Sequence, residues 1–145
     1  YCFQAINGSD SKMNPSQLTI KDRQLLQRLL VIRSDKEAKL RRELVLHRQK
    51  FRELLDRQIL INLDRQAQTN RLRQWQIPAQ ILTPTELITF KLTLMNEYQK
   101  ERALAETAEM LVIEKEQLES TMVHMQQAIL WLVKSQQKLQ EVVDE

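Results

Sequence analysis

The chain has 145 residues, among them a single glycine and three prolines. So few turn-forming residues exclude a compact globular fold and favour a few long elements joined at few corners. Charged residues make up 28% of the chain, aromatic residues only 5%, and the formal net charge is +3, which is typical of long solvent-exposed helices rather than of a large hydrophobic core.

The first twelve residues contain the only glycine and show no hydrophobic periodicity. We expect residues 1–12 to be a disordered leader or the remnant of a cloning linker, with Met13 as the natural start. The single cysteine, Cys2, cannot form an internal disulfide, which favours a reducing compartment. No apolar run approaches the ~20 residues of a membrane helix, and no secretory signal is recognisable.

A first helix is predicted over about residues 16–75. Asn14, Pro15 and Gln17 form a capping pattern, and Thr19 with Asp22 offers a second possible start. Apolar residues recur three and four apart on either side of a phase change, which predicts a stutter near residue 36. The predicted stripe consists of Leu18, Leu25, Leu29, Ile32, Leu40, Leu44, Phe51, Leu54, Leu55, Ile59, Leu63, Ala67, Leu72 and Trp75.

A turn is predicted over residues 76–83, because Pro78 removes a backbone donor and ends the first helix. A second helix then begins, with Thr83 as its cap, Pro84 at the first helical position and Glu86 able to reach back to the cap. This helix is predicted over about residues 84–143.

The second helix carries the strongest pattern in the chain, two series of residues that each repeat every seven positions. Two apolar positions per heptad over more than five heptads predict the seam of a left-handed coiled coil. One series is Leu104, Leu111, Leu118, Met125, Leu132 and Leu139, and the other is Ala108, Lys115, Met122, Ile129, Gln136 and Val143.

The predicted fold is all-α, two helices of ~60 residues in one antiparallel coiled-coil hairpin that covers residues 13–145. From Met13 to Trp75 the chain has 15 basic and 7 acidic residues, and from Pro84 to Glu145 it has 6 basic and 11 acidic residues. A basic helix attracts an acidic one along its length, whereas two parallel copies of either would repel. The alternative is one extended helix, kinked at Pro78, that dimerises in parallel.

A turn centred near Gln80 predicts that the segment 29–32 faces the segment 128–130. Both lie in the densest apolar runs of the chain, so we expect an apolar collar there that includes Leu30, Leu130, Trp131 and Val133. Such a patch typically binds a partner, and the alternative is a locally thicker core. The predicted partner-binding residues are Leu29, Leu30, Ile32, Leu130, Trp131, Val133, Arg41, Arg42, Arg48 and Trp75. At the tip, we expect Trp75 to pack locally and close the hairpin, with a binding role as the alternative.

No catalytic, cofactor-binding or metal-binding residues are predicted. His47 and His124 stand alone, and no glycine-rich segment can hold a phosphate. We therefore expect no enzyme and no cofactor. No nucleic-acid partner is expected: a basic-zipper helix should run straight into its leucine heptads, whereas Pro84 and acidic residues precede Leu104, and the arginines of the first helix are interleaved with acidic residues. Direct membrane insertion is not expected.

The segment from Leu25 to Leu44 resembles the opening of the YscO/FliJ family, the small coiled-coil stalk proteins of bacterial type III secretion systems and flagella. The segment from Leu82 to Leu87 is similar to the break and restart of the helix in that family. The resemblance implies a non-enzymatic cytoplasmic stalk at the secretion apparatus, a monomer or weak oligomer. Its partners would be the hexameric export ATPase, the export gate and possible secretion chaperones. The alternatives are a self-assembling coiled-coil scaffold or tether and, second, a secretion chaperone.

Overall fold

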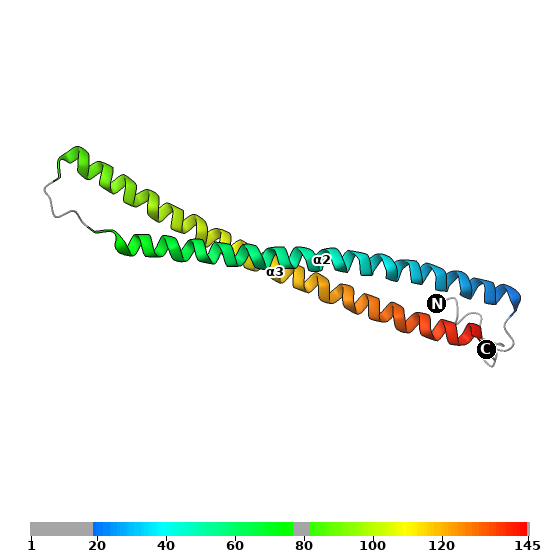
Figure 1. Cartoon of the computed structure of the whole chain (residues 1–145). Coiled ribbons are helices and arrows are strands. Elements are labelled where there is room, and N and C mark those ends of the chain that lie inside the picture. The colour runs from blue at the N-terminus through cyan, green and yellow to red at the C-terminus, as the bar shows by residue number, and fades with distance from the viewer. Residues whose placement is uncertain (1–18, 77–81, 145) are drawn as a thin grey trace, which may run out of the picture. The chain divides into compact units, whose positions relative to one another are not determined.

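A computed structural model describes residues 19–76 and 82–144. Helix α2 spans Ile20–Gln74 and helix α3 spans Pro84–Asp144, with no strand among the described residues. The two helices pack against each other and run in opposite directions (Figure 1), which confirms the predicted helical hairpin. The predicted leader at residues 1–12, the helix start at Asn14 and most of the predicted turn, residues 77–81, lie outside the described residues.

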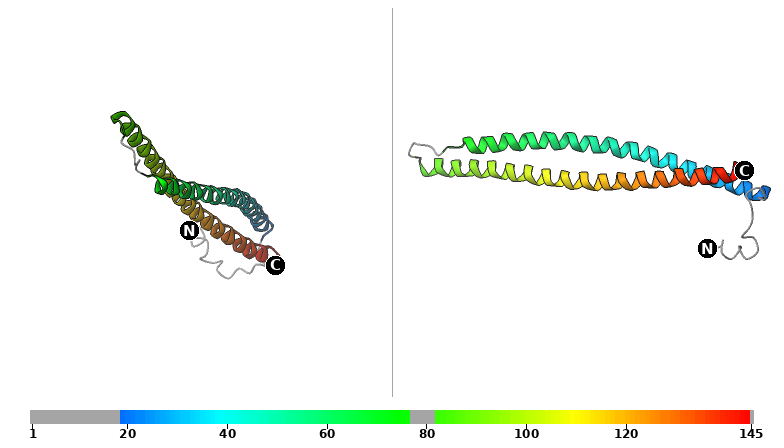
Figure 2. Two further views of the ribbon diagram at one scale, coloured as in Figure 1. Left: turned by 60° about the vertical axis from the view of Figure 1, so that its left-hand side comes forward. Right: turned by 90° about the horizontal axis from the view of Figure 1, so that it is seen from below.

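The packing divides into two units. The described part of unit 1 pairs residues 19–46 with residues 122–144, and that of unit 2 pairs residues 47–76 with residues 82–121. In unit 1, Arg23 Nη1 donates a hydrogen bond of 2.8 Å to the carbonyl of Val143. In unit 2, Gln68 Nε2 donates one of 3.0 Å to the carbonyl of Glu97. Each unit is therefore an antiparallel pair of helical segments (Figure 2).

Threonine caps begin both helices. At α2, Thr19 Oγ1 accepts a hydrogen bond of 3.1 Å from the amide of Asp22, and Asp22 Oδ2 accepts one of 3.3 Å from the amide of Thr19. This reciprocal capping box confirms the second of the two predicted starts. At α3, Thr83 Oγ1 accepts a hydrogen bond of 3.2 Å from the amide of Glu86, which confirms Thr83 as the cap.

The seam of α3 follows the predicted heptads. All the buried apolar residues of this helix belong to the two predicted series: Ala108, Leu111, Leu118, Ile129, Leu132 and Val143. The repeat continues toward the start of α3, where Phe90, Leu94, Glu97 and Glu101 take the seam positions and are half-buried. The seam is thus apolar over most of its length but polar at Glu97, Glu101, Lys115 and Gln136.

The seam of α2 differs from the prediction. Residues at alternating steps of four and three are buried or half-buried: Leu26, Leu30, Arg33, Glu37, Leu40, Leu44, His47, Phe51, Leu54, Gln58, Ile61, Arg65, Gln68, Leu72 and Trp75. The step pattern is unbroken through residue 36, so the predicted stutter is wrong. Leu25, Ile32, Ile59 and Leu63 of the predicted stripe are exposed instead. The cause is that polar side chains occupy seam positions, which an apolar pattern alone cannot detect.

The predicted register is also wrong. The segment 29–32 was expected to face the segment 128–130, yet Leu30 lines a cavity together with Val133 and Gln136, and Arg33 reaches Ser135. Residues of α2 therefore meet residues of α3 that lie further toward its C-terminus than predicted. The expected centre of the turn near Gln80 was the source of this error.

Candidate protein-binding surfaces

The apolar collar of unit 1 is divided between a solvent-exposed part and a half-buried part. Trp131 is 60% exposed, and Leu130 and Ile32 are also exposed. Leu29, Leu30 and Val133 are half-buried. The neighbouring Val31 on α2 is exposed as well. Unit 1 therefore exposes an indole ring and aliphatic side chains to solvent. This agrees with the predicted apolar collar at Leu130 and Trp131.

Arg33 fixes the orientation of Trp131. Its guanidinium carbon lies 5.3 Å from the centroid of the indole ring, and its Nη1 donates a hydrogen bond to Ser135 Oγ. A cation over the face of tryptophan is attracted by the ring quadrupole, and the hydrogen bond holds the guanidinium in place. Trp131 is thus supported from the seam side while its other surface remains exposed.

A cavity of about 460 Å³ opens beside the seam in unit 1. Its apolar part comes from Leu30, Val31 and Val133, and polar side chains surround it. Gln136 Nε2 donates a hydrogen bond of 3.0 Å to Glu37 Oε1, which ties two seam positions together across the pair of helices. Leu30 and Val133 therefore lie in a polar-rimmed depression rather than in a dry core.

The remaining predicted partner-binding residues are scattered. Arg41 is exposed and forms an ion pair of 2.7 Å with Glu37 of the same helix, and Arg42 is exposed nearby. Arg48 is exposed in unit 2. Trp75 is half-buried and packs edge to face on Phe90, with ring centroids 5.3 Å apart. Trp75 therefore packs locally between the end of α2 and the start of α3.

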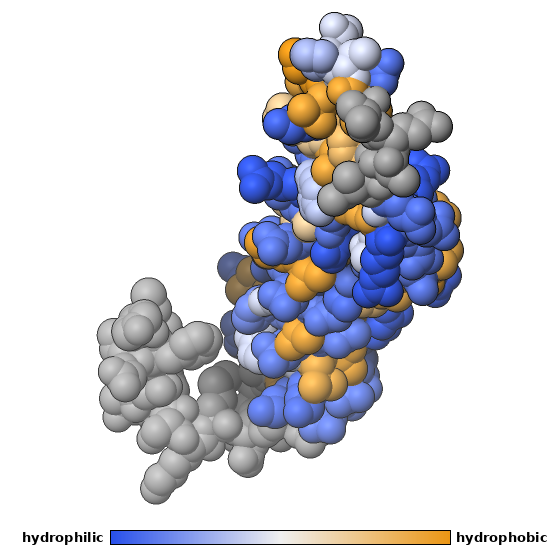
Figure 3. Space-filling model, turned by 90° about the vertical axis from the view of Figure 1, so that its left-hand side faces the viewer, coloured by the Kyte–Doolittle hydropathy of each residue, from blue (hydrophilic) through white to orange (hydrophobic). Residues whose placement is uncertain are grey.

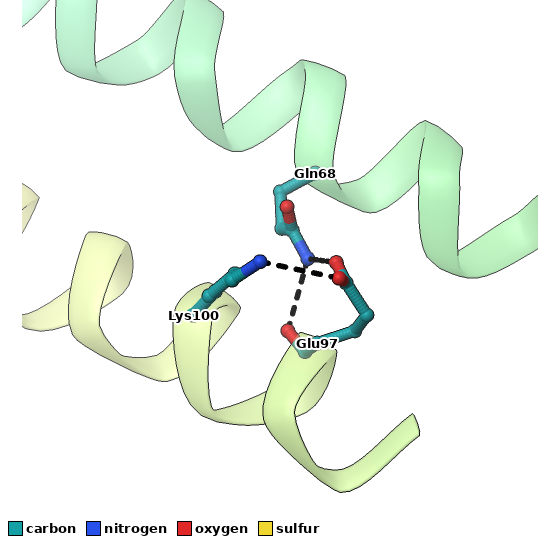
Figure 4. A network of polar contacts seen from close by, with 3 residues as sticks. All are labelled: Gln68, Glu97 and Lys100. Atoms are coloured by element: carbon teal, nitrogen blue, oxygen red, sulfur yellow. Dashed lines mark hydrogen bonds and ion pairs between the residues drawn. The ribbon is translucent and has the colours of Figure 1, made fainter. Parts of the chain in front are cut away.

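Unit 2 contains a polar layer in its seam (Figure 4). Gln68 is buried, and its amide nitrogen donates to Glu97 twice, at 2.6 Å to Oε2 and at 3.0 Å to the main-chain carbonyl. Lys100 Nζ lies 3.3 Å from the other oxygen of that carboxylate. At the neighbouring seam positions of the two helices, Arg65 Nη2 lies 3.5 Å from Glu101 Oε1. The other carboxylate oxygen, Glu101 Oε2, is buried without a hydrogen-bond partner among the described residues.

The polar layer shifts the acidity of one residue. The hydrogen bond from Gln68 holds the pKa of Glu97 below its ordinary value, and the hydrogen bond from Lys100 adds to this effect. Both contacts favour the ionised carboxylate. Polar residues at seam positions specify register and orientation at some expense of stability, which is the role that this layer fits.

A further exposed apolar face was missed by the sequence reasoning. On α3 in unit 2, Leu92, Met95, Met110 and Ile113 are all exposed, and Ile88 is exposed before them. Figure 3, which looks onto the end where α2 ends and α3 begins, shows orange apolar side chains exposed among hydrophilic ones. The signal in the sequence is a set of apolar residues, several of them three or four apart, that lie outside the heptad series.

Metal-binding clusters and membrane-spanning segments were sought in the part of the chain that the structure describes. No group of three or more histidine, cysteine or acidic residues could hold a metal ion there. Neither α2 nor α3 contains an apolar stretch long enough to cross a membrane.

Comparison with known proteins gives no match to any family model, to any curated protein or to any solved structure.

Proposed function

We propose that this chain is a non-enzymatic protein-binding coiled coil, and specifically the cytoplasmic stalk of a bacterial type III secretion system. In this role it would bind the export ATPase ring and couple it to the export gate. The observation that carries the proposal is the exposed part of the collar in unit 1, formed by Val31, Ile32, Leu130 and Trp131.

These residues have the character of a binding surface. Tryptophan and arginine are the residue types that contribute most often to binding energy at protein interfaces. Trp131 is already oriented by Arg33, so binding would immobilise little additional side-chain freedom. Exposed aliphatic residues on both helices of unit 1, Ile32 and Leu130 among them, would extend the contact in a complex.

Charge supports a partner with an acidic rim. The part of α2 in unit 1, residues 20–46, has eight basic and four acidic side chains. Arg28 and Arg42 are exposed, seven positions to either side of Asp35 on the outward face of that helix. A partner that places carboxylates around an apolar pocket would complement both the charge and the apolar residues.

The test is a binding titration against the purified export ATPase of the same bacterium, assembled as a ring. Trp131→Ala should weaken binding by about tenfold or more, as expected for a buried aromatic anchor, and leave helicity nearly intact. The control is Leu60→Ala, which removes an equally exposed apolar side chain from α2 in unit 2 and should leave binding unchanged. Loss of helicity with unchanged binding would identify Trp131 as a core residue and refute the proposed surface.

A second candidate function, a self-assembling scaffold or tether, is favoured by the exposed apolar face of α3 in unit 2. In a coiled coil that remains monomeric, a second apolar stripe outside the seam would stay exposed to solvent. Failure of the wild-type chain to bind the ATPase ring, together with formation of a stable parallel dimer or a larger assembly, would make this candidate the better one.

A further inference from the structure

The outer face of α3 in unit 2 carries exposed apolar side chains that nothing covers among the described residues, namely Ile88 near the start of the helix and four others further along. Leu92, Met95, Met110 and Ile113 are between 49% and 62% exposed. Their positions follow from the seam, whose residues here include Leu94, Leu104, Ala108 and Leu111. In heptad numbering, Leu92 and Ile113 lie directly opposite the seam, while Met95 and Met110 lie on either flank of that outermost line.

These four residues are arranged symmetrically about the residue pair 102–103, whereas Ile88 lies outside the symmetric set and would meet Gln117. Leu92 and Ile113 are equally distant from that point, and so are Met95 and Met110. If a second copy of α3 ran antiparallel along the outer face, Leu92 of one copy would meet Ile113 of the other, and Met95 would meet Met110. Each contact would occur twice, as an interface with twofold symmetry requires.

The charges at the centre of the same face favour the antiparallel arrangement. Arg102 and Glu106 are exposed near the centre, and neither has an ion pair within the described residues. Antiparallel pairing about 102–103 brings Arg102 of each copy near Glu106 of the other. Beyond the centre, Glu109 and Glu116 are also exposed on the outer face, whereas the outward positions from 85 to 102 contain no acidic residue. A parallel pairing would instead place each of these charges against its own copy.

We propose that α3 of unit 2 pairs with α3 of a second copy of this chain, in an antiparallel and twofold-symmetric manner. The occupant of the outer face is therefore the chain itself, selected by its own apolar and charge complementarity. The contact is small and its apolar residues are separated by a polar centre, so we expect a dissociation constant on the order of micromolar or weaker. This inference does not depend on the proposed role as a secretion stalk.

Sedimentation velocity of the full chain over a wide range of concentration tests the pairing. The expected result is a reversible monomer–dimer equilibrium. Ile113→Lys should raise the dissociation constant by about tenfold or more, because it places a charge in the contact. The matched control is Leu60→Lys, at a similarly exposed apolar position of α2 in the same unit, and it should leave the equilibrium unchanged. A chain that remains monomeric, or a dimer weakened equally by both variants, would overturn the proposal.

A mixing experiment tests the antiparallel geometry. Arg102→Glu alone gives a chain with two carboxylates at the centre of the contact, and Glu106→Arg alone gives one with two guanidinium groups. Each variant should self-associate a few-fold more weakly than the wild type, because like charges meet in both cross-chain pairs. An equimolar mixture of the two should associate more tightly than either alone. If the mixture associates no better than its separate components, the antiparallel pairing is wrong. Circular dichroism of each variant checks that helicity is retained.

Discussion

Replacing Leu132 and Leu130 with alanine, in separate variants, tests which face of α3 packs against α2 in unit 1. The two leucines are two positions apart on one helix, but Leu132 is 2% exposed and Leu130 is 53% exposed. They share residue type, helix and unit, so they form a matched pair. A difference in their effects therefore measures burial in the seam rather than helix propensity.

The expected magnitudes follow from that burial. Leucine-to-alanine changes in cores cost about 2–5 kcal/mol, and a seam between two helices can admit water into the vacated site, so we expect about 2–3 kcal/mol for Leu132→Ala. Leu130 has about half of its side chain in solvent already, and alanine is the better helix former. We therefore expect a loss of about 1 kcal/mol or less for Leu130→Ala.

The assay is urea unfolding followed by circular dichroism, at a concentration where the chain is monomeric. The slope of unfolding free energy against urea should be the same for the wild type and both variants, which shows that the same surface is exposed on unfolding. Equal losses for the two variants, or a larger loss for Leu130→Ala, would show that α3 presents a different face to α2 and would refute the seam described above.

Two further predictions concern the helix cap and the polar layer. Thr83→Ala removes the hydroxyl that accepts from the Glu86 amide and should lower the free energy of unfolding by about 1 kcal/mol, whereas Thr83→Ser should retain most of it; equal losses would argue against capping. Because the pKa of Glu97 is lowered in the folded state, its contribution to stability is fully present above the ordinary pKa and is lost as pH falls through the lowered value. Urea midpoints of Glu97→Gln should therefore fall less between neutral and acidic pH than those of the wild type, and parallel profiles would contradict this.

The sequence was sufficient to predict the architecture because one signal dominates it. The heptad series from Leu104 to Val143 contains all the buried apolar residues of α3, and Thr83 and Pro84 set the start of that helix. Both inferences depend on local chemistry, namely hydrophobic periodicity and capping. Local chemistry of this kind can be recognised in one sequence without knowledge of the partner segment.

The errors arose where the seam is polar. Arg33 and Glu37 occupy seam positions in unit 1 because Ser135 and Gln136 provide hydrogen-bond partners on the other helix. A pattern of apolar residues alone does not reveal those partners, so the predicted stripe includes Ile32, which is exposed. The predicted stutter follows from this error, because the apolar residues before and after it do not share one heptad register. The register depends on the same contacts between distant segments, so it could not be predicted from the spacing within either helix.

The candidate surface was predicted only in part. Trp131 and Leu130 were correctly expected to lie off the seam, because their apolar run is wider than the stripe that one coiled coil buries. The contact between Arg33 and Trp131 was not predicted, since it requires the correct register. Arg41, Arg42 and Arg48 were chosen for their charge alone, and the exposed face of α3 was overlooked because its residues lie between those of a stronger pattern.

The polar layer of unit 2 has a consequence for the order in which the chain folds. Gln68 and Glu97 are 29 residues apart in the sequence, whereas Arg23 and Val143, which are joined by a hydrogen bond in unit 1, are 120 residues apart. Closing the shorter loop loses less chain entropy, so the contacts of Gln68 and Glu97 are favoured to form first. Sliding α3 along α2 by one heptad would preserve the seam positions but would place Gln68 against Leu104 and Arg65 against Ala108. The contacts that are favoured to form first are therefore also the contacts that disfavour a slipped alignment. They do so before Arg23 and Val143 come together.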